Sequence, residues 1–128
     1  MNAAGRDELN DLAQRVIGAV YEVANVLGVG FLEAVYERSL VNELALRGIK
    51  SRRQARVIVN YKGSPVGTYR CDVLVEGRLL VEVKCADGFA NENLAQCLNY
   101  LKATGQPLCL LVNFQKPKVE WKRVVFNF

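Results

Sequence analysis

Hydrophobic residues in the first part of the chain recur at the spacing of an amphipathic helix. Over residues 7–27 they fall every three or four positions, at Leu9, Leu12, Val16, Val20, Val23 and Leu27. Asp7 is the expected cap at the start of this helix, and Gly28 interrupts the pattern at its end. Gly30 is expected to adopt a positive φ before a second predicted helix over residues 32–47.

Beyond residue 50 the hydrophobic period shortens to two, as in strands. Three strands, a helix and two further strands are predicted, over residues 55–61, 67–75, 77–86, 91–104, 108–114 and 120–128. This order indicates an α/β fold with three antiparallel strands, then a right-handed parallel crossover through the helix, in a mixed sheet. The last strand is expected at a sheet edge. Because the chain contains no repeat or linker, residues 1–128 are predicted to form one domain.

The third predicted strand carries two charged residues inside an apolar run. Glu82 and Lys84 lie within the sequence GRLLVEVKCA, and they share one face because side chains alternate along a strand. The preceding strand contributes Asp72, which also has apolar neighbours. Burying such charges is costly unless they are paired or bound to a metal, so this strand pair is the candidate site.

The hairpin loop between these two strands decides whether Asp72 and Glu82 meet. A two-residue loop at residues 76–77 would put the carboxylates on opposite faces of the sheet. A three-residue loop over residues 75–77, with Gly77 in the left-handed conformation of a bulge, would put them on the same face. A shared site therefore requires the three-residue loop.

Two carboxylates on one face repel each other and raise each other's pKa. A divalent cation such as Mg²⁺ or Mn²⁺ removes this penalty, because carboxylate oxygens are its preferred ligands. A neighbouring lysine can position a water or neutralise charge that develops on a phosphate. The competing interpretation is an ion pair between Lys84 and one of the acids, and spacing alone does not separate the two.

Composition narrows the possible chemistry. The 128 residues include no histidine, which excludes Ser–His and Cys–His nucleophile systems and His-rich zinc sites. The four cysteines form no CxxC pair and are expected to be free thiols; they are Cys71, Cys85, Cys97 and Cys109. No apolar run reaches the roughly 18 to 20 residues of a membrane span, and no secretory signal is visible. A soluble, cytoplasmic protein without a membrane partner is therefore expected.

The net charge of +4 suits an anionic partner such as nucleic acid. Basic residues gather in two clusters, one at Arg47, Lys50, Arg52, Arg53 and Arg56 and the other at Lys116, Lys118, Lys122 and Arg123. These clusters fit solvated loop charges and a phosphate-contacting patch equally well. If the second interpretation holds, Arg52 and Arg53 are candidate substrate-binding residues.

Together these features resemble the PD-(D/E)xK nuclease superfamily. In its restriction-endonuclease-like core, a helix that carries an acid precedes three strands, a helix and a further strand, the order predicted here. Gly30, Glu33 and Tyr36 fit the pattern G-x-x-E-x-x-Y, the signature of the GxxExxY family assigned to this superfamily. Gln96 and Tyr100 give Q-x-x-x-Y, which resembles the helix motif of the RecB-type branch.

The resemblance, which extends over residues 13–114, implies a role for each acid and for the lysine. Glu33, Asp72 and Glu82 would bind Mg²⁺ or Mn²⁺, and the carbonyl of Val83 would be a further ligand. Lys84 would orient or activate the attacking water. Many relatives also carry one histidine late in the first helix and another shortly before the glutamine, and this chain has neither.

The motif residues on the predicted helices also have structural explanations that need no catalytic role. Glu33 would also stabilise the N-terminal end of its helix, and Tyr36 is expected to pack beneath the site. Gln96 would place the substrate backbone or Lys84, or else be an ordinary boundary residue. Tyr100, one helical turn later, would contact substrate or belong to the core.

The resemblance implies a metal-dependent nuclease that hydrolyses phosphodiester bonds of nucleic acid, with DNA favoured over RNA. The alternative is a catalytically silent module that keeps the fold and binds nucleic acid or protein. The complete set of acids and lysine favours the enzyme. A homodimer would supply additional surface for holding a duplex, because a chain of 128 residues offers little by itself.

Overall fold

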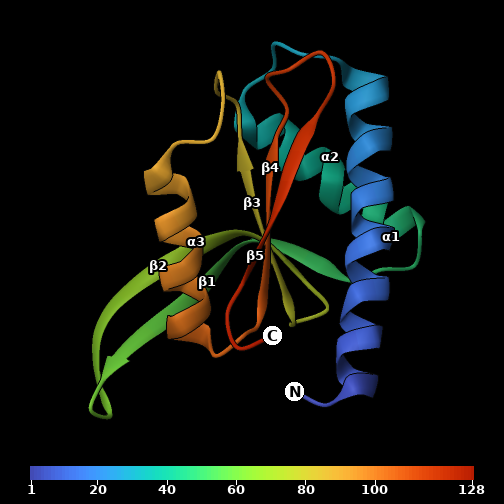
Figure 1. Ribbon diagram of the computed structural model, residues 1–128. Coiled ribbons are helices and arrows are strands. Elements are labelled where there is room, and N and C mark those ends of the chain that lie inside the picture. The colour runs from blue at the N-terminus through green and yellow to red at the C-terminus, as the bar shows by residue number, and fades with distance from the viewer.

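The computed structural model describes residues 1–128 and contains three helices and one five-stranded mixed sheet (Figure 1). The elements are α1 (Ala3–Leu27), α2 (Glu33–Leu46), β1 (Ser51–Tyr61), β2 (Ser64–Val75), β3 (Leu79–Lys84), α3 (Asn91–Thr104), β4 (Leu108–Asn113) and β5 (Glu120–Val125). The strand order is β1-β2-β3-β4-β5, with β3 parallel to β4 and the other neighbours antiparallel. The predicted element order, mixed sheet and edge position of β5 are confirmed.

Helices cover both faces of the sheet. On one face Val81 and Leu110 pack with α1 and α2, and on the other Leu80 and Leu111 pack with α3 (Figure 1). All of β4 and all of β3 except its last residue are therefore buried. This double cover explains why both strands read as nearly continuous apolar runs. None of the three helices combines the length and hydropathy needed to span a membrane.

Helix α1 is capped by Asn2 at its N-terminal end and by Gly28 at its C-terminal end. The predicted Asp7 cap is wrong, because α1 begins at Ala3 and the side chain of Asn2 accepts a hydrogen bond from Gly5 N at 2.8 Å. A side-chain acceptor at this position satisfies one of the free N–H groups of the first turn. Gly30 has a φ of 107°, which confirms the positive φ predicted between the two helices.

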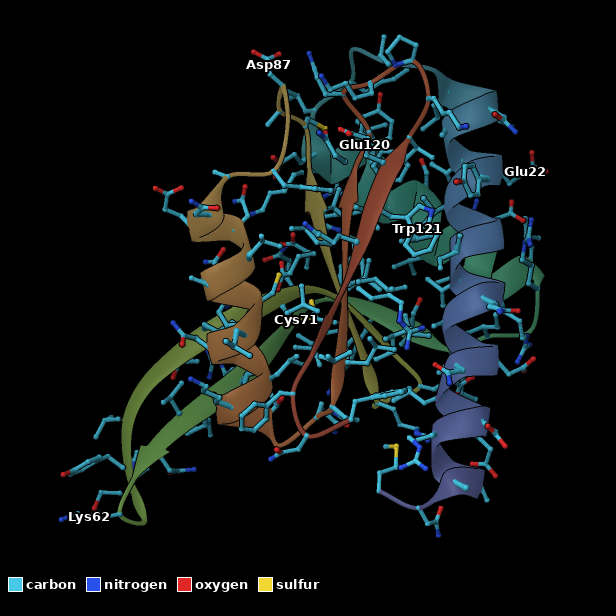
Figure 2. All side chains as sticks on the ribbon, viewed as in Figure 1. Glu22, Lys62, Cys71, Asp87, Glu120 and Trp121 are labelled. Carbon is cyan, nitrogen blue, oxygen red and sulfur yellow. The ribbon has the colours of Figure 1, made fainter.

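β1 and β2 form a hairpin that is longer than predicted. The turn contains only Lys62 and Gly63, both with positive φ, because the two strands continue almost to the tip. β3 pairs with β2 only over residues 73–75, so the rest of the hairpin projects past α3 (Figure 1). We refer to residues 55–71 as the arm, and Lys62 lies at its tip (Figure 2).

The side chains of the β1–β2 hairpin change faces of the sheet where the arm begins. Val73 packs with α1 and α2, whereas Cys71 packs with α3, so residues of the same parity change faces at Asp72. Gln54 lies opposite Asp72 in the β1–β2 register and has a φ of 52°. This conformation is uncommon for residues other than glycine and breaks the regular pleat. Asp72 therefore sits at the boundary between the two covered faces.

Asn113, at the end of β4, fixes the chain that follows β3. Its side chain is fully buried and donates to the Ala86 carbonyl at 2.8 Å. Its Oδ1 accepts from Ala86 N at 3.2 Å and from Gln115 N at 3.0 Å. One amide thus satisfies three backbone groups, two of them just beyond Lys84.

Replacing Asn113→Ala is expected to lower the free energy of unfolding by about 2 kcal/mol or more, because it leaves buried backbone groups without partners. Urea unfolding followed by circular dichroism measures this change. Asn99→Ala, at an exposed position on α3, is the matched control and should change stability little. Equal stability of the two variants would contradict the role given to Asn113.

Candidate active site

The register of β2 and β3 brings Asp72 and Glu82 together. Val75 pairs with Leu79, and continuing this antiparallel register places Asp72 opposite Glu82. Three residues separate the two strands, and Gly77 has a φ of 67° in the left-handed region. The same-face arrangement predicted for a three-residue loop is therefore confirmed, with the loop one residue further along the chain than expected.

Asp72 is held between two neighbouring strands. Its Oδ2 accepts a hydrogen bond from Val83 N at 2.8 Å. The β2–β3 ladder ends at Val73, so this carboxylate takes the place of the next backbone acceptor. Its Oδ1 lies 3.5 Å from Nε2 of Gln54 on β1. The position of Asp72 thus depends on the backbone of β3 and on the irregular residue of β1.

Glu82 is a buried carboxyl with an unsatisfied oxygen. The residue is 3% exposed, and its Oε1 has no hydrogen-bond partner. Burial raises the pKa of Glu82 to about 10, with further contributions from a hydrogen bond to Asp72 and from its charge. Cys71, on the side of the sheet toward α3, contributes to the surroundings that exclude water (Figure 2). A protonated Glu82 is the favoured state without a compensating cation.

Lys84 does not neutralise either acid directly. It is the last residue of β3 and is half-buried. The structure contains three ion pairs, and Lys84 takes part in none of them. The structure therefore lacks the ion pair between Lys84 and Asp72 or Glu82 that was the competing interpretation. Lys84 remains available for another anionic group.

Glu37 is a further buried acid that the sequence analysis missed. It is 4% exposed, and its Oε1 lies 3.1 Å from Nη2 of Arg53 and accepts from Nε2 of Gln54 at 2.9 Å. Burial raises its pKa, the charge of Asp72 raises it further, and the Gln54 hydrogen bond opposes both. Glu37 falls four residues after Glu33, on the same helix face, and that spacing was the available signal.

Glu33 is the first residue of α2, one helical turn before Glu37. It is exposed, and its Oε1 accepts from Cys85 N at 3.3 Å, one residue beyond Lys84. No hydrogen bond joins it to Asp72. Across residues 1–128, no group of three or more acidic or cysteine side chains is arranged to hold a metal ion. The carboxylates that the structure brings together directly are those of Asp72 and Glu82.

The two predicted α3 residues lie in different surroundings. Gln96 is exposed and its side chain makes no hydrogen bond within the chain. Tyr100 stacks on Tyr69 of the arm, with ring centroids 3.7 Å apart and 7° between the planes. Burial, and then the charge of Glu82, raises the pKa of Tyr100 to about 12. The stacked pair fastens the arm to α3.

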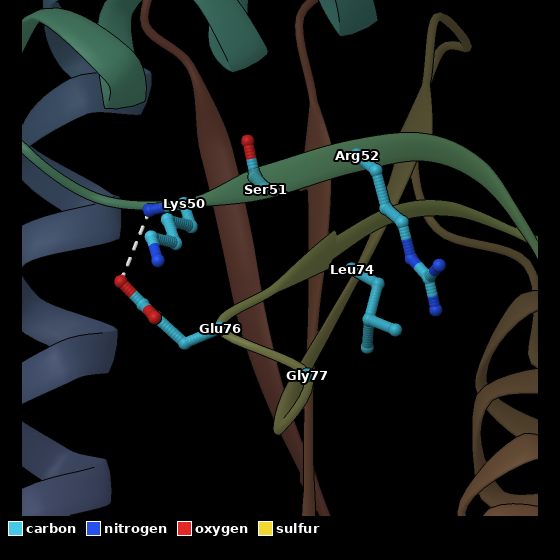
Figure 3. Close-up of a pocket in the computed structure, with 6 residues that line it drawn as sticks. All are labelled: Lys50, Ser51, Arg52, Leu74, Glu76 and Gly77. Atoms are coloured by element: carbon cyan, nitrogen blue, oxygen red, sulfur yellow. Dashed lines mark hydrogen bonds between the residues drawn. The ribbon is translucent and has the colours of Figure 1, made fainter.

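Neither of the two predicted substrate-binding arginines forms an ion pair with Asp72 or Glu82. Arg53 pairs with Glu37, as described above. Arg52 lines a pocket with Leu74 and Glu76 at the β2–β3 hairpin (Figure 3). There, Glu76 Oε1 accepts from Lys50 N at 3.0 Å. This hairpin is at the opposite end of β3 from Lys84, so the pocket is separate from the acidic site.

A family model described as the PD-(D/E)XK nuclease superfamily matches residues 10–124. The chain belongs to the PD-(D/E)XK nuclease superfamily. Asp72 and the Glu82–Lys84 segment, on adjacent antiparallel strands, fit the D…(D/E)XK part of the pattern in this name, and Cys71 stands where the pattern has proline.

Comparison with solved structures supports the fold of this PD-(D/E)XK protein. The crystal structure of SSO0001 matches with a TM-score of 0.54 at 13% sequence identity, over 73% of this chain. The matched part is 50% of that chain, so the present sequence corresponds to about half of it. At this identity the likeness concerns the fold alone. A comparison with curated proteins gives no match.

Replacing Glu82→Gln is expected to stabilise the metal-free PD-(D/E)XK chain by about 1 kcal/mol or more at neutral pH. Burial raises the folded-state pKa of Glu82 from 4.5 to about 10, so the folded protein binds a proton that the unfolded chain releases. Between these values the stability of the wild type falls as pH rises, whereas the amide does not titrate. Unfolding in EDTA at several pH values measures the growing difference.

The control for this comparison is Glu92→Gln, at an exposed position in the first turn of α3. It replaces the same acid by the same amide at an exposed position, and should leave the dependence of stability on pH unchanged from that of the wild type. A Glu82→Gln variant that is less stable than the wild type at every pH would contradict the burial argument.

Proposed function

We propose that this protein is a metal-dependent nuclease that hydrolyses phosphodiester bonds of nucleic acid, with DNA as the preferred polymer. The observation that carries the proposal is the unsatisfied Oε1 of buried Glu82 beside Asp72, with no ion pair from Lys84. Two neighbouring carboxylates repel each other, and the arrangement becomes favourable when a cation binds oxygens of both. Membership of the superfamily supports the same chemistry.

The donor set fits Mg²⁺ or Mn²⁺. Magnesium commonly binds proteins through one or two carboxylates and completes its shell with waters and substrate phosphates. Asp72 and Glu82 would hold the ion, with the Val83 carbonyl as a further ligand. Such an ion supplies charge stabilisation for a phosphate and activation of a water at neutral pH. No histidine is needed for this set.

Asp72, Lys84 and Gln96 have separate roles in the proposed reaction. Asp72 is oriented by Val83 N, so its second oxygen stays near Gln54 and the acid pair stays aligned. Lys84 has no acid partner, and in this proposal its ammonium orients the nucleophilic water and offsets the charge that develops on the phosphate. Gln96, exposed on α3, would contact the substrate backbone.

The α2 helix offers two acids for support of the site. Glu33 lies against Cys85 N, next to Lys84, and is proposed as the acid that completes the metal site. Glu37 reaches Asp72 through Gln54 and is proposed as a positioning residue for that carboxylate. Removing a carboxylate that positions a metal ligand, as Glu37 would, typically lowers metal affinity about 10-fold to 100-fold.

The finer family assignment is also part of the proposal. Gly30, Glu33 and Tyr36 support the GxxExxY group, and Gln96 and Tyr100 support a relation to the RecB-type branch. Tyr36 is buried and stacks on Phe114 with centroids 4.5 Å apart, which supports a packing role for the motif tyrosine. The four free thiols suit the reducing cytoplasm, the proposed location.

Metal binding by Asp72 and Glu82 is expected to raise the melting temperature, because an ion that binds only the folded state stabilises it by mass action. Titration of Mn²⁺ in a thermal-shift assay measures the effect. Asp72→Asn and Glu82→Gln should abolish the rise. Glu33→Gln and Glu37→Gln should each shift the midpoint to about 10-fold higher Mn²⁺.

Glu92→Gln again serves as the control and should respond to Mn²⁺ as the wild type does. A wild-type rise that persists in both Asp72→Asn and Glu82→Gln would place the ion elsewhere. If only one of Glu33→Gln and Glu37→Gln weakens binding, that residue is the supporting acid of α2.

Cleavage of labelled single-stranded and double-stranded DNA and RNA is expected with Mn²⁺ or Mg²⁺ and not with EDTA. Lys84→Ala should lower the rate about 100-fold or more, as does loss of one stabilising donor in other enzymes. Lys102→Ala, which removes an exposed lysine of α3, should leave the rate unchanged. Binding without cutting by the metal-loaded wild type would favour the silent binding module instead.

A further inference from the structure

All charged residues of the arm are basic. Residues 55–71 include three basic residues, Arg56, Lys62 and Arg70, and no acidic residue. The outer part of the arm, toward its tip at Lys62, also projects past α3 (Figures 1 and 2). It therefore carries positive charge outward from the body of the molecule, beginning beside Asp72.

The two arginines of the arm form an unfavourable pair. Arg56 is directly opposite Arg70 in the β1–β2 register, and both residues are exposed. Neither takes part in any of the three ion pairs of the structure. Like charges directly opposite each other on a sheet destabilise it, and an anion between the two guanidinium groups would reverse the sign of this interaction.

One face of the arm is open. Val57 and Tyr69 pack toward α3, and because side chains alternate along a strand, their neighbours point the other way. Ile58 and Thr68 are exposed on this second face and extend it beyond the arginine pair. No helix or strand covers them, so the face presents an arginine pair followed by small and aliphatic side chains.

The open face is connected to the acidic site by hydrogen bonds. Nη1 of Arg70 donates to the Gln54 carbonyl at 3.4 Å. Nε2 of the same Gln54 lies 3.5 Å from Oδ1 of Asp72. The arginine pair is therefore adjacent to the acidic site, because Arg70 lies only two residues before Asp72 on β2.

We propose that the open face of the arm binds the phosphate backbone of double-stranded nucleic acid whose cleaved phosphate lies at Asp72 and Glu82. The proposal rests on the proposed nuclease function and adds the substrate class. Arginine suits phosphate because its planar guanidinium donates two parallel hydrogen bonds. From Ser64 to Cys71 the strand spans roughly 26 Å, the length of about eight base pairs.

The side chains of the arm favour a duplex over a single strand. Proteins that hold single strands use exposed aromatic rings on which bases stack. Tyr69 is already stacked on Tyr100. Tyr61, the other aromatic residue of the arm, is exposed but lies next to the tip, where the Lys62 ammonium is 5.4 Å from the centroid of its ring. The open face beside Arg56 and Arg70 holds no aromatic ring. Its contacts therefore suit the outside of a duplex.

The test measures binding separately from cleavage. Fluorescence anisotropy in EDTA gives the Kd for a labelled DNA duplex longer than the arm, at several salt concentrations. Arg56→Gln and Arg70→Gln should each lower the slope of log Kd against log salt by about 0.9, and the double variant by about 1.8. Arg15→Gln, an exposed arginine of α1, is the matched control and should leave the slope unchanged.

Each outcome decides between the proposals. Wild-type slope and affinity in the folded double variant would overturn the arm proposal while leaving cleavage by the wild type untouched. Loss of slope with single-stranded but not duplex DNA would overturn the duplex assignment. Loss of slope with duplex, in a protein that never cuts with Mn²⁺ or Mg²⁺, would support the arm and overturn the nuclease. Melting temperatures of all variants confirm that they fold.

Discussion

The β2–β3 register is the constraint on which the rest of the structure depends. It sets Asp72 opposite Glu82 within a sheet that helices cover on both faces, so one carboxyl loses its water while the other stays at the boundary. The cover is needed for the apolar core, because β3 and β4 bury nearly all of their side chains. A site built into this strand pair therefore lies in a low-dielectric environment in which an unpaired negative charge is costly.

The change of sheet faces at Gln54 connects the acid pair to both helical layers. If β2 continued its regular alternation, the carboxylate of Asp72 would lie wholly under α3, with no connection to α2. Instead Asp72 lies at the boundary, where Gln54 links it to Glu37 of α2. The same change of faces lets Tyr69 of the arm stack on Tyr100 of α3. One unusual backbone conformation thus relates both helical layers to the acid pair.

The sequence predicted those features of the structure that depend on local hydrophobic patterns and on the cost of burying charge. Hydrophobic periodicity gave the element order, and the cost of burying Glu82 identified the strand pair before any geometry was known. It did not recover Glu37, because a glutamate in a helix usually faces water and only the tertiary fold buries it. Nor does a rule of propensity indicate a positive φ at Gln54. Asn113 was recoverable: a polar residue inside an apolar strand raises the question that Glu82 raised.

The irregularity at Gln54 has a second consequence, for the edge of the sheet. β1 is an outermost strand, and a long unpaired strand edge is a template on which another chain can add and start aggregation. Here the edge is interrupted twice, by the positive φ of Gln54 and by the register shift after Val59. The exposed charges of Arg52 and Arg56 flank the first interruption. The distortion that aims Asp72 thus also interrupts the exposed edge of β1, and such interruptions make an edge a poorer template for a foreign strand.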